Sequence, residues 1–307
     1  MHIPDGFLSV PVAGANSLAS VVALLIALQR SETAFGIRRA PILGLTTAFI
    51  FAAQMINFPV AGGTSGHLLG GTLAAIILGS PWAGILCIAT VLIIQAVLFA
   101  DGGITALGAN IFNMAVIGVW TGWILTQTLQ KLLGGPQKRL PLVGGIAAAF
   151  SVVTAAIACA IELALSGIAP ATVVLPTMTG VHILIGIGEG LITGGVLTYL
   201  ATTRPDLLPG EGQKFQGWLV PIVSIFLIAG VLSLFASAWP DGLERVAESL
   251  GFINLAEVVG VNIPTPFADY RIQGLGQIGT SIAGLLGSGL CFSVAFGIAK
   301  FVKTNNV

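Results

Sequence analysis

Long runs of apolar residues constrain this chain more than any other feature of its sequence. A helix needs about 20 mostly apolar residues to cross a bilayer, and a water-soluble core has little use for many such runs. Only 8% of the residues are charged, whereas soluble domains have about 25%. The sequence therefore predicts an all-α polytopic membrane protein, and it argues against a soluble enzyme or a disordered regulator.

About nine segments are apolar and long enough to be membrane helices. They lie at roughly 12–29, 40–57, 68–80, 82–100, 111–130, 142–166, 181–200, 218–238 and 275–300. The third is short, and the glycine-rich residues 62–67 before it favour a loop over a helix. Irregular backbone at membrane depth is tolerated only where it is buried in protein or lines a cavity. A short helix after such a loop therefore indicates a binding site.

The basic residues predict the orientation, because cytoplasmic loops are enriched in Lys and Arg. With the N-terminus outside, ten of the twelve basic residues fall in cytoplasmic segments. These ten are Arg30, Arg38, Arg39, Lys131, Lys138, Arg139, Arg204, Lys214, Lys300 and Lys303. We therefore expect a multi-pass protein of a prokaryotic cell (inner) membrane, surrounded by lipid, with its N-terminus outside.

The chain divides at a polar stretch. We expect a seven-helix unit over residues 1–205, a linker over 206–216 and a two-helix unit over 217–307. The outer loop 239–274 of the second unit contains five of the twelve acidic residues, which we interpret as a solvated loop. Twelve acidic and twelve basic residues cancel, so no net charge attracts nucleic acid.

The three histidines, His2, His67 and His182, all fall on the outer side in this topology. Each could be an ordinary interfacial polar residue, and their grouping is weak evidence by itself. We expect His182 to begin the seventh span at its outer end. The case for a metal site therefore depends on the coordination chemistry of position 2.

A histidine at position 2 can chelate a metal together with the chain terminus. The free amine, the amide nitrogen between Met1 and His2, and the His2 Nδ1 atom close a five-membered and a six-membered ring with one cation. A large second side chain protects Met1 from removal, and no cleavable leader is evident. A fourth nitrogen, from another imidazole, completes a square plane, which favours Ni(II) or Cu(II), with low-spin Co(II) possible. Affinity should fall on acidification, because the donors must be deprotonated.

Four separate segments carry a resemblance to a known family. Residues 1–7 (MHIPDGF), 63–68 (GTSGHL), 100–110 (ADGGITALGAN) and 180–189 (GVHILIGIGE) resemble the CbiM/NikM family. This family supplies the substrate-binding (S) component of energy-coupling-factor transporters for cobalt and nickel. The resemblance implies that the N-terminal segment dips into a seven-helix S-component bundle. It also implies that Met1, His2 and His67 ligate the metal.

The second unit carries a resemblance of its own. Residues 239–244 (WPDGLE) are similar to the PDGLE-type accessory subunit CbiN or NikN. That partner is a two-span protein whose outer loop helps the metal to reach the S component. The resemblance implies that this accessory unit is fused here to the S component.

The sequence predicts a transporter subunit without its own ATPase. Residues 210–215 (GEGQKF) do not match a phosphate-binding loop. We therefore expect a metal-capture subunit for Ni(II) or Co(II), with a slight preference for nickel. It would work with a transmembrane coupling (T) subunit and separate ATP-binding-cassette ATPases. The alternative is a self-sufficient metal channel or secondary carrier. Such a protein would need charged residues along a path through the membrane, and Glu162 and Glu189 are the only acidic residues within the predicted spans.

Five further polar residues are candidates for a supporting role around the metal. Each could form hydrogen bonds to the ligands, and His182 could also be a transient way-station. Ordinary helix capping or a structural hydrogen bond explains them equally well. These residues are His182, Glu189, Asp101, Asn110 and Asn113.

Overall fold

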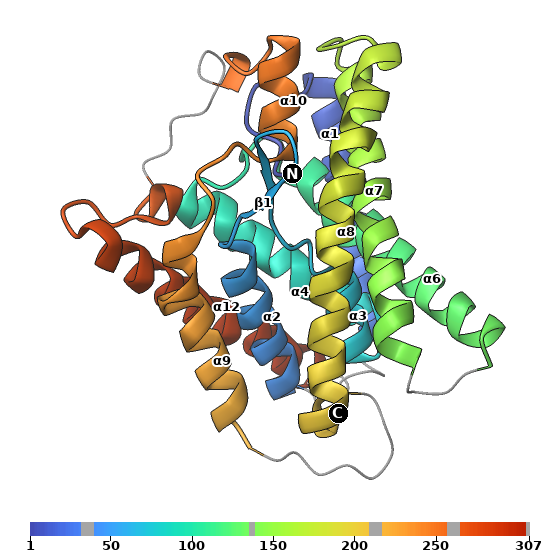
Figure 1. The fold of residues 1–307 in the computed structure, drawn as a ribbon, viewed down its shortest axis with the longest axis vertical. Coiled ribbons are helices and arrows are strands. Elements are labelled where there is room, and N and C mark those ends of the chain that lie inside the picture. Colours follow the sequence, from blue (N-terminus) through green and yellow to red (C-terminus); the bar gives the residue numbers. More distant parts are fainter. Residues whose placement is uncertain (32–39, 135–138, 209–216, 257–264, 305–307) are drawn as a thin grey trace.

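The computed structural model describes residues 1–31, 40–134, 139–208, 217–256 and 265–304, and it is almost entirely helical (Figure 1). Within these residues, six helical segments are long and apolar enough to cross a bilayer, and two shorter apolar helices accompany them. The prediction of an all-α polytopic membrane protein is confirmed.

The first unit contains the helices that the sequence predicted, with two of them interrupted. Their bounds are α1 (Val10–Ser31), α2 (Ala40–Gln54), α3 (Gly71–Leu78), α4 (Pro81–Ile94), α5 (Leu107–Asn110), α6 (Val119–Leu132), α7 (Leu140–Leu165) and α8 (Ala171–Thr203). A wide π-helical turn extends α4 over Gln95–Phe99, and another joins α5 to α6 over Ile111–Gly118.

Helix α8 begins earlier than the sequence indicated. Its first residue is Ala171, so His182 lies three turns inside the helix rather than at its outer end. The expectation of a span that starts near residue 181 is wrong, because Pro176 is accommodated within the helix. This places His182 deeper in the bundle than we expected.

The second unit packs directly on the first. It contains α9 (Leu219–Gly230), α10 (Gly242–Leu250) and α12 (Gly276–Thr304), with short 3₁₀ turns at Leu232–Phe235 and Ala268–Tyr270. Helices α9 and α12 lie against α2 (Figure 1). A Cβ atom at Gly287 would come within 2.2 Å of the Phe51 ring, so glycine permits the close contact of α12 with α2. Residues 209–216 of the expected linker lie outside the described residues.

Helices α7 and α8 form the closest pair in the first unit. A Cβ atom at Gly186 would lie 2.7 Å from the Ala149 carbonyl oxygen, and one at Gly190 would lie 2.7 Å from the Gly145 carbonyl oxygen. Small residues allow such backbone contact where no hydrophobic effect drives helices together. Residues of both helices, Val152 of α7 and His182 of α8, line a small cavity together with Met1.

The glycine-rich segment before α3 is a hairpin rather than an irregular loop. Strands β1 (Phe58–Val60) and β2 (Thr64–Gly66) pair antiparallel. The second unit adds to this hairpin, because Ser65 N–H donates to the Pro240 carbonyl at 2.8 Å, and Ser237 N–H donates to the Asn57 carbonyl at 2.8 Å. The N-terminus, the hairpin and α10 lie toward one end of the molecule (Figure 1).

Candidate metal centre

The first residues of the chain are buried inside the bundle. Met1 is 6% exposed and Ile3 is fully buried. Asn110 secures this segment with two hydrogen bonds: its Oδ1 accepts from Ile3 N–H at 2.7 Å, and its Nδ2 donates to the Ile3 carbonyl at 3.0 Å. The Gly103 N–H also donates to the Ile3 carbonyl at 2.9 Å. The backbone of position 3 is thus fully paired, which fixes the two residues before it.

Gly103 permits the closest approach of the N-terminal segment to the loop after α4. A Cβ atom at this position would lie 2.2 Å from Asp5 N and 2.7 Å from the carbonyl carbon of Pro4. Next to it, Thr105 N–H donates to Asp5 Oδ1 at 2.7 Å. The segment 1–5 therefore lies in a groove that only glycine leaves open.

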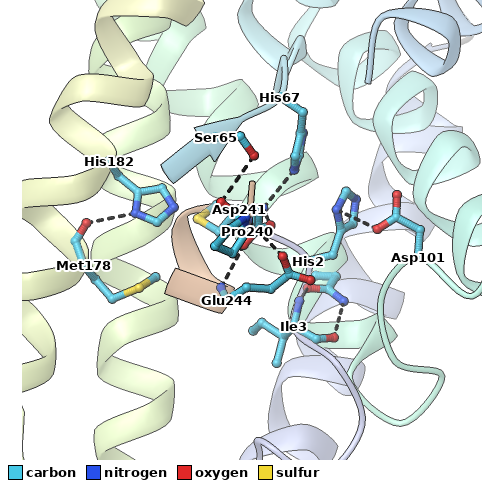
Figure 2. A network of polar contacts seen from close by, with 12 residues as sticks. His2, Ile3, Ser65, His67, Asp101, Met178, His182, Pro240, Asp241 and Glu244 are labelled. Carbon is cyan, nitrogen blue, oxygen red and sulfur yellow. Dashed lines mark hydrogen bonds and ion pairs between the residues drawn. The ribbon is translucent and has the colours of Figure 1, made fainter. Parts of the chain in front are cut away.

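The N-terminal amine meets His67 and a residue of the second unit. The amine nitrogen lies 2.8 Å from His67 Nε2 and 2.7 Å from Asp241 Oδ2 (Figure 2). His67 Nδ1 lies 3.1 Å from the Leu68 carbonyl oxygen. Because a carbonyl only accepts hydrogen bonds, Nδ1 carries the proton and the Nε2 lone pair faces the amine.

His2 lies beside His67 but faces a carboxylate. The two rings stack with centroids 4.8 Å apart, and His2 Nδ1 lies 3.1 Å from Asp101 Oδ1 (Figure 2). Tyr270 of the second unit donates to Asp101 Oδ2 at 2.5 Å and accepts from Gln95 Nε2 at 2.9 Å. The structure therefore brings Met1, His2 and His67 together, with Asp101 held at the outer side of His2.

Both imidazoles are neutral at ordinary pH. Burial, together with the positive charge of the nearby amine, lowers the pKa of His2 and of His67 to about 3. Burial alone would raise the pKa of Asp241, but the amine beside it holds that pKa well below its usual range. The centre thus combines neutral nitrogen donors with one ionised carboxylate.

The WPDGLE motif of the second unit caps this centre. Asp241 is the N-cap of α10: its Oδ1 accepts from Glu244 N–H, and Glu244 Oε2 accepts from Asp241 N–H, each at 2.8 Å. Ser65 Oγ donates to the Trp239 carbonyl at 2.7 Å. Our interpretation of the acidic residues as a solvated loop is wrong for Asp241, whose side chain is 13% exposed and binds the amine. The capping-box pattern D-x-x-E was the signal that could have placed it at a helix start.

A cavity of about 900 Å³ opens beside the imidazoles. Both units line it, and its polar lining includes His2, His67, Asp101, Asp241 and Tyr270. The two carboxylates that bind His2 and the amine therefore face the same space. A hydrated cation could approach both from this cavity.

The remaining predicted residues take supporting positions. Glu189 accepts from Leu69 N–H at 2.6 Å and from Gly70 N–H at 2.9 Å, directly after His67. Asn113 donates instead to Glu162 Oε2, on α7, at 2.7 Å. His182 Nδ1 bonds to the Met178 carbonyl at 2.8 Å. Glu189 thus fixes the turn that carries His67, whereas Asn113 belongs to a separate α7 contact.

The distance between the Met1 amine nitrogen and His67 Nε2 matches the distance between neighbouring nitrogen donors in a square-planar metal site. With metal–nitrogen bonds of about 2.0 Å, neighbouring donors in a plane lie about 2.8 Å apart. The observed separation of Met1 N and His67 Nε2 is 2.8 Å. In the described parts of the chain, no three His, Cys, Asp or Glu side chains are grouped to hold a metal.

Two family models match the chain in succession. Residues 2–207 match the cobalt uptake substrate-specific transmembrane region (CbiM), and residues 215–304 match the PDGLE domain.

Several known proteins are similar along much of their length. A putative fused nickel transport protein, NikMN, of Archaeoglobus fulgidus is 37% identical over 99% of this chain and 100% of its own. The cobalt transport protein CbiM of Sorangium cellulosum is 33% identical over 68% of this chain and 94% of its own. A crystal structure of a truncated transition metal transporter is 36% identical with a TM-score of 0.59, covering 66% of this chain and 98% of that one.

Proposed function

Since the chain belongs to the CbiM family of cobalt-uptake transmembrane regions and continues into a PDGLE domain, it is a multi-pass metal transport protein, and we propose that it captures Ni(II) or Co(II) at its own N-terminus. The single observation that carries this proposal is the 2.8 Å separation of Met1 N and His67 Nε2. That separation equals the edge expected for a plane of four nitrogen donors around one metal ion.

The proposed ligands are the amine, the amide nitrogen of His2, His2 Nδ1 and His67 Nε2. The first three belong to one chelate, so the protein needs only to bury the N-terminus and present one further imidazole. Asn110 and Gly103 bury the terminus, and Glu189 fixes the turn of His67. Planar nitrogen donors favour nickel over ions that prefer oxygen ligands.

Metal binding requires His2 to exchange partners. Its Nδ1 lies 3.1 Å from Asp101 Oδ1, so the ring must turn from Asp101 toward the metal. Asp101 is well placed for this exchange, because Tyr270 holds its other oxygen. The carboxylate keeps the imidazole at the mouth of the cavity until a cation replaces it.

The second unit serves as the entrance. The cavity of about 900 Å³ leads from its loop to the imidazoles, and Asp241 holds the amine at the inner wall. Carboxylates that line a cavity raise the local concentration of cations and their rate of association. This arrangement supports a role of the fused PDGLE unit in delivery of the metal.

Energy coupling is proposed to come from separate proteins. The S-component role implies a T subunit and a pair of ATP-binding-cassette ATPases in a prokaryotic inner membrane. The distribution of Lys and Arg supports an outside N-terminus, so the cavity would face the supply of metal. The chain alone would then capture metal but not pump it.

Calorimetry of the purified chain with Ni(II) and Co(II) tests the site. We expect one equivalent of tightly bound metal, and at least a tenfold loss of affinity in His67→Ala. The matched control is Thr193→Val, which changes a fully buried polar side chain but none of the four planar donors. Equal affinity of the His67→Ala protein and the unaltered protein would contradict the proposed ligand set.

Reconstitution in vesicles tests the energy source. We expect Ni(II) uptake only when the T subunit and the ATPases are present with ATP. Uptake by the chain alone, driven by an ion gradient, would identify it as a channel or secondary carrier instead.

A further inference from the structure

His182 has an imidazole nitrogen that is buried and unpaired. Its side chain is 1% exposed, and Nε2 has no hydrogen-bond partner within the described ranges. The other nitrogen, Nδ1, lies 2.8 Å from the Met178 carbonyl oxygen and must donate to it. Nε2 therefore presents a free lone pair. Leaving such an acceptor unpaired in the interior costs about 1–3 kcal/mol.

The same arrangement orients His67. Its Nδ1 donates to a backbone carbonyl, that of Leu68, and its Nε2 faces the centre. A hydrogen bond from one ring nitrogen to a carbonyl is the usual way in which proteins aim the other nitrogen at a metal. His182 and His67 thus both have the tautomer that binds a cation through Nε2.

Both imidazoles border one small cavity. It has a volume of about 10 Å³, and Met1, His67, Met114 and His182 are among the residues that line it. Gly242 of the second unit closes it on one side, because a Cβ atom there would lie 2.9 Å from His182 Nε2. The His182 ring points toward Asp241 and Pro240 (Figure 2).

This cavity is at the lower limit of size for a water molecule. About 10–15 Å³ is the least space in which a water fits, and a buried water needs two to four polar partners. The lining here is largely apolar, with Leu69, Val152 and Ile185 beside the imidazoles. A divalent ion there would take lone pairs from the imidazoles, and the Asp241 carboxylate, toward which the His182 ring points (Figure 2), would balance its charge.

We infer that His182 Nε2 is a second, inner donor for the transported metal. The inference rests on the proposed function. Its reaction class is ligand exchange: a bond from the divalent ion to His182 Nε2 forms as the bond to the Met1 amine nitrogen breaks, with no change of oxidation state. Neutral imidazole is a good ligand for Ni(II) and Co(II). The exchange lets the ion leave the N-terminal chelate for the interior without being released as a free ion.

The test uses the fact that the chain has three histidines. His2→Gln breaks the chelate, keeps a large second residue and leaves His67 and His182 as the remaining imidazoles. We expect the His2→Gln protein to bind Ni(II) more weakly than the unaltered chain, with two imidazoles per nickel by X-ray absorption. Adding His182→Asn to the His2→Gln protein should lower its residual Ni(II) affinity at least tenfold and reduce the number of imidazoles per nickel from two to one. Adding Thr193→Val, which changes another fully buried polar residue of α8, should change neither.

Three results would overturn the inference. They are no residual Ni(II) binding in the His2→Gln protein, a single imidazole in its nickel spectrum, or residual binding that His182→Asn leaves unchanged. If the His182→Asn protein does not fold, the imidazole count of the His2→Gln protein decides alone. A failure of the proposed function looks different: the unaltered chain would then bind Ni(II) weakly, or His2→Gln would not weaken it.

Discussion

Replacing Gly103 by alanine should expel the N-terminal segment from its groove. The added Cβ atom would lie 2.2 Å from Asp5 N and 2.4 Å from Asp5 Oδ1, where ordinary contacts begin at 3.4 Å. The neighbours on one side are backbone atoms of Pro4 and Asp5, which cannot rotate away as a side chain does. The segment must therefore move by about 1 Å or leave the groove.

A shift of this size should abolish tight metal binding. Metal–ligand distances tolerate deviations of only about 0.2 Å, and Ile3, which Gly103 N–H binds, is directly attached to His2, one of the proposed ligands. We expect Gly103→Ala to lower Ni(II) affinity at least about a hundredfold, equivalent to about 2.8 kcal/mol. The helix packing remains, because Gly103 lies in the loop between α4 and α5.

Calorimetric Ni(II) titration and thermal unfolding should be measured on the same preparations. Gly14→Ala is the matched control, since a Cβ atom at that position of α1 meets nothing within 4 Å. Unaltered Ni(II) affinity in a folded Gly103→Ala protein would refute the idea that the docked segment builds the site.

Three further predictions concern the surroundings of the chelate. Burial holds the pKa of His2 and His67 at about 3, so both imidazoles stay neutral from pH 8 to pH 5. Metal binding should therefore release about two protons, one from the Met1 amine and one from the amide nitrogen of His2. Ni(II) affinity should then fall about a hundredfold per pH unit on acidification, which titration in buffers of different ionisation enthalpy can check. A loss of only about tenfold per unit, the effect of a single proton, would contradict an amide donor. Glu189→Gln keeps one of the two side-chain oxygens that accept from the Leu69 and Gly70 N–H groups after His67. It should lower the free energy of unfolding, measured by denaturant titration, by about 1–3 kcal/mol. An unchanged free energy would show that the turn does not depend on this carboxylate. Asp241→Asn keeps a good cap for α10 but removes the negative charge beside the amine. The association rate of Ni(II), measured by stopped flow, should therefore fall about three- to tenfold and lose part of its salt dependence, whereas Glu248→Gln, at an exposed position, should not lower it. Equal association rates in the two variants would argue against an electrostatic entrance.

The fold class follows from the sequence because the bilayer makes simple demands. Apolar runs of the right length must be helices, so the segments were visible without any tertiary information. The start of α8 was missed because Pro176 and the threonines around it obscured a helix that begins at Ala171. The hairpin Phe58–Gly66 was missed because its strands are only three residues each. Their pairing depends on residues 237–240 of the second unit, which no local pattern reveals.

The core of the candidate site was also open to prediction. The chelate needs a histidine at position 2, which is read directly from the sequence, together with the free amine of Met1 that the proposal assumes. The partners supplied by tertiary structure were not predictable in this way. Asp241 lies 240 residues from the amine that it binds, and Tyr270 lies 169 residues from Asp101. Contacts of this separation depend on how the two units dock.

The state of the N-terminal amine tests the central claim most directly. A retained formyl group on Met1 removes the basic lone pair while adding little volume and changing no side chain. Ni(II) titration of the formylated and the free chain, purified side by side, should show at least a hundredfold weaker binding by the formylated protein, with His67 and His2 intact. Equal affinity of the two forms would contradict the amine chelate and leave the side chains alone to hold the metal.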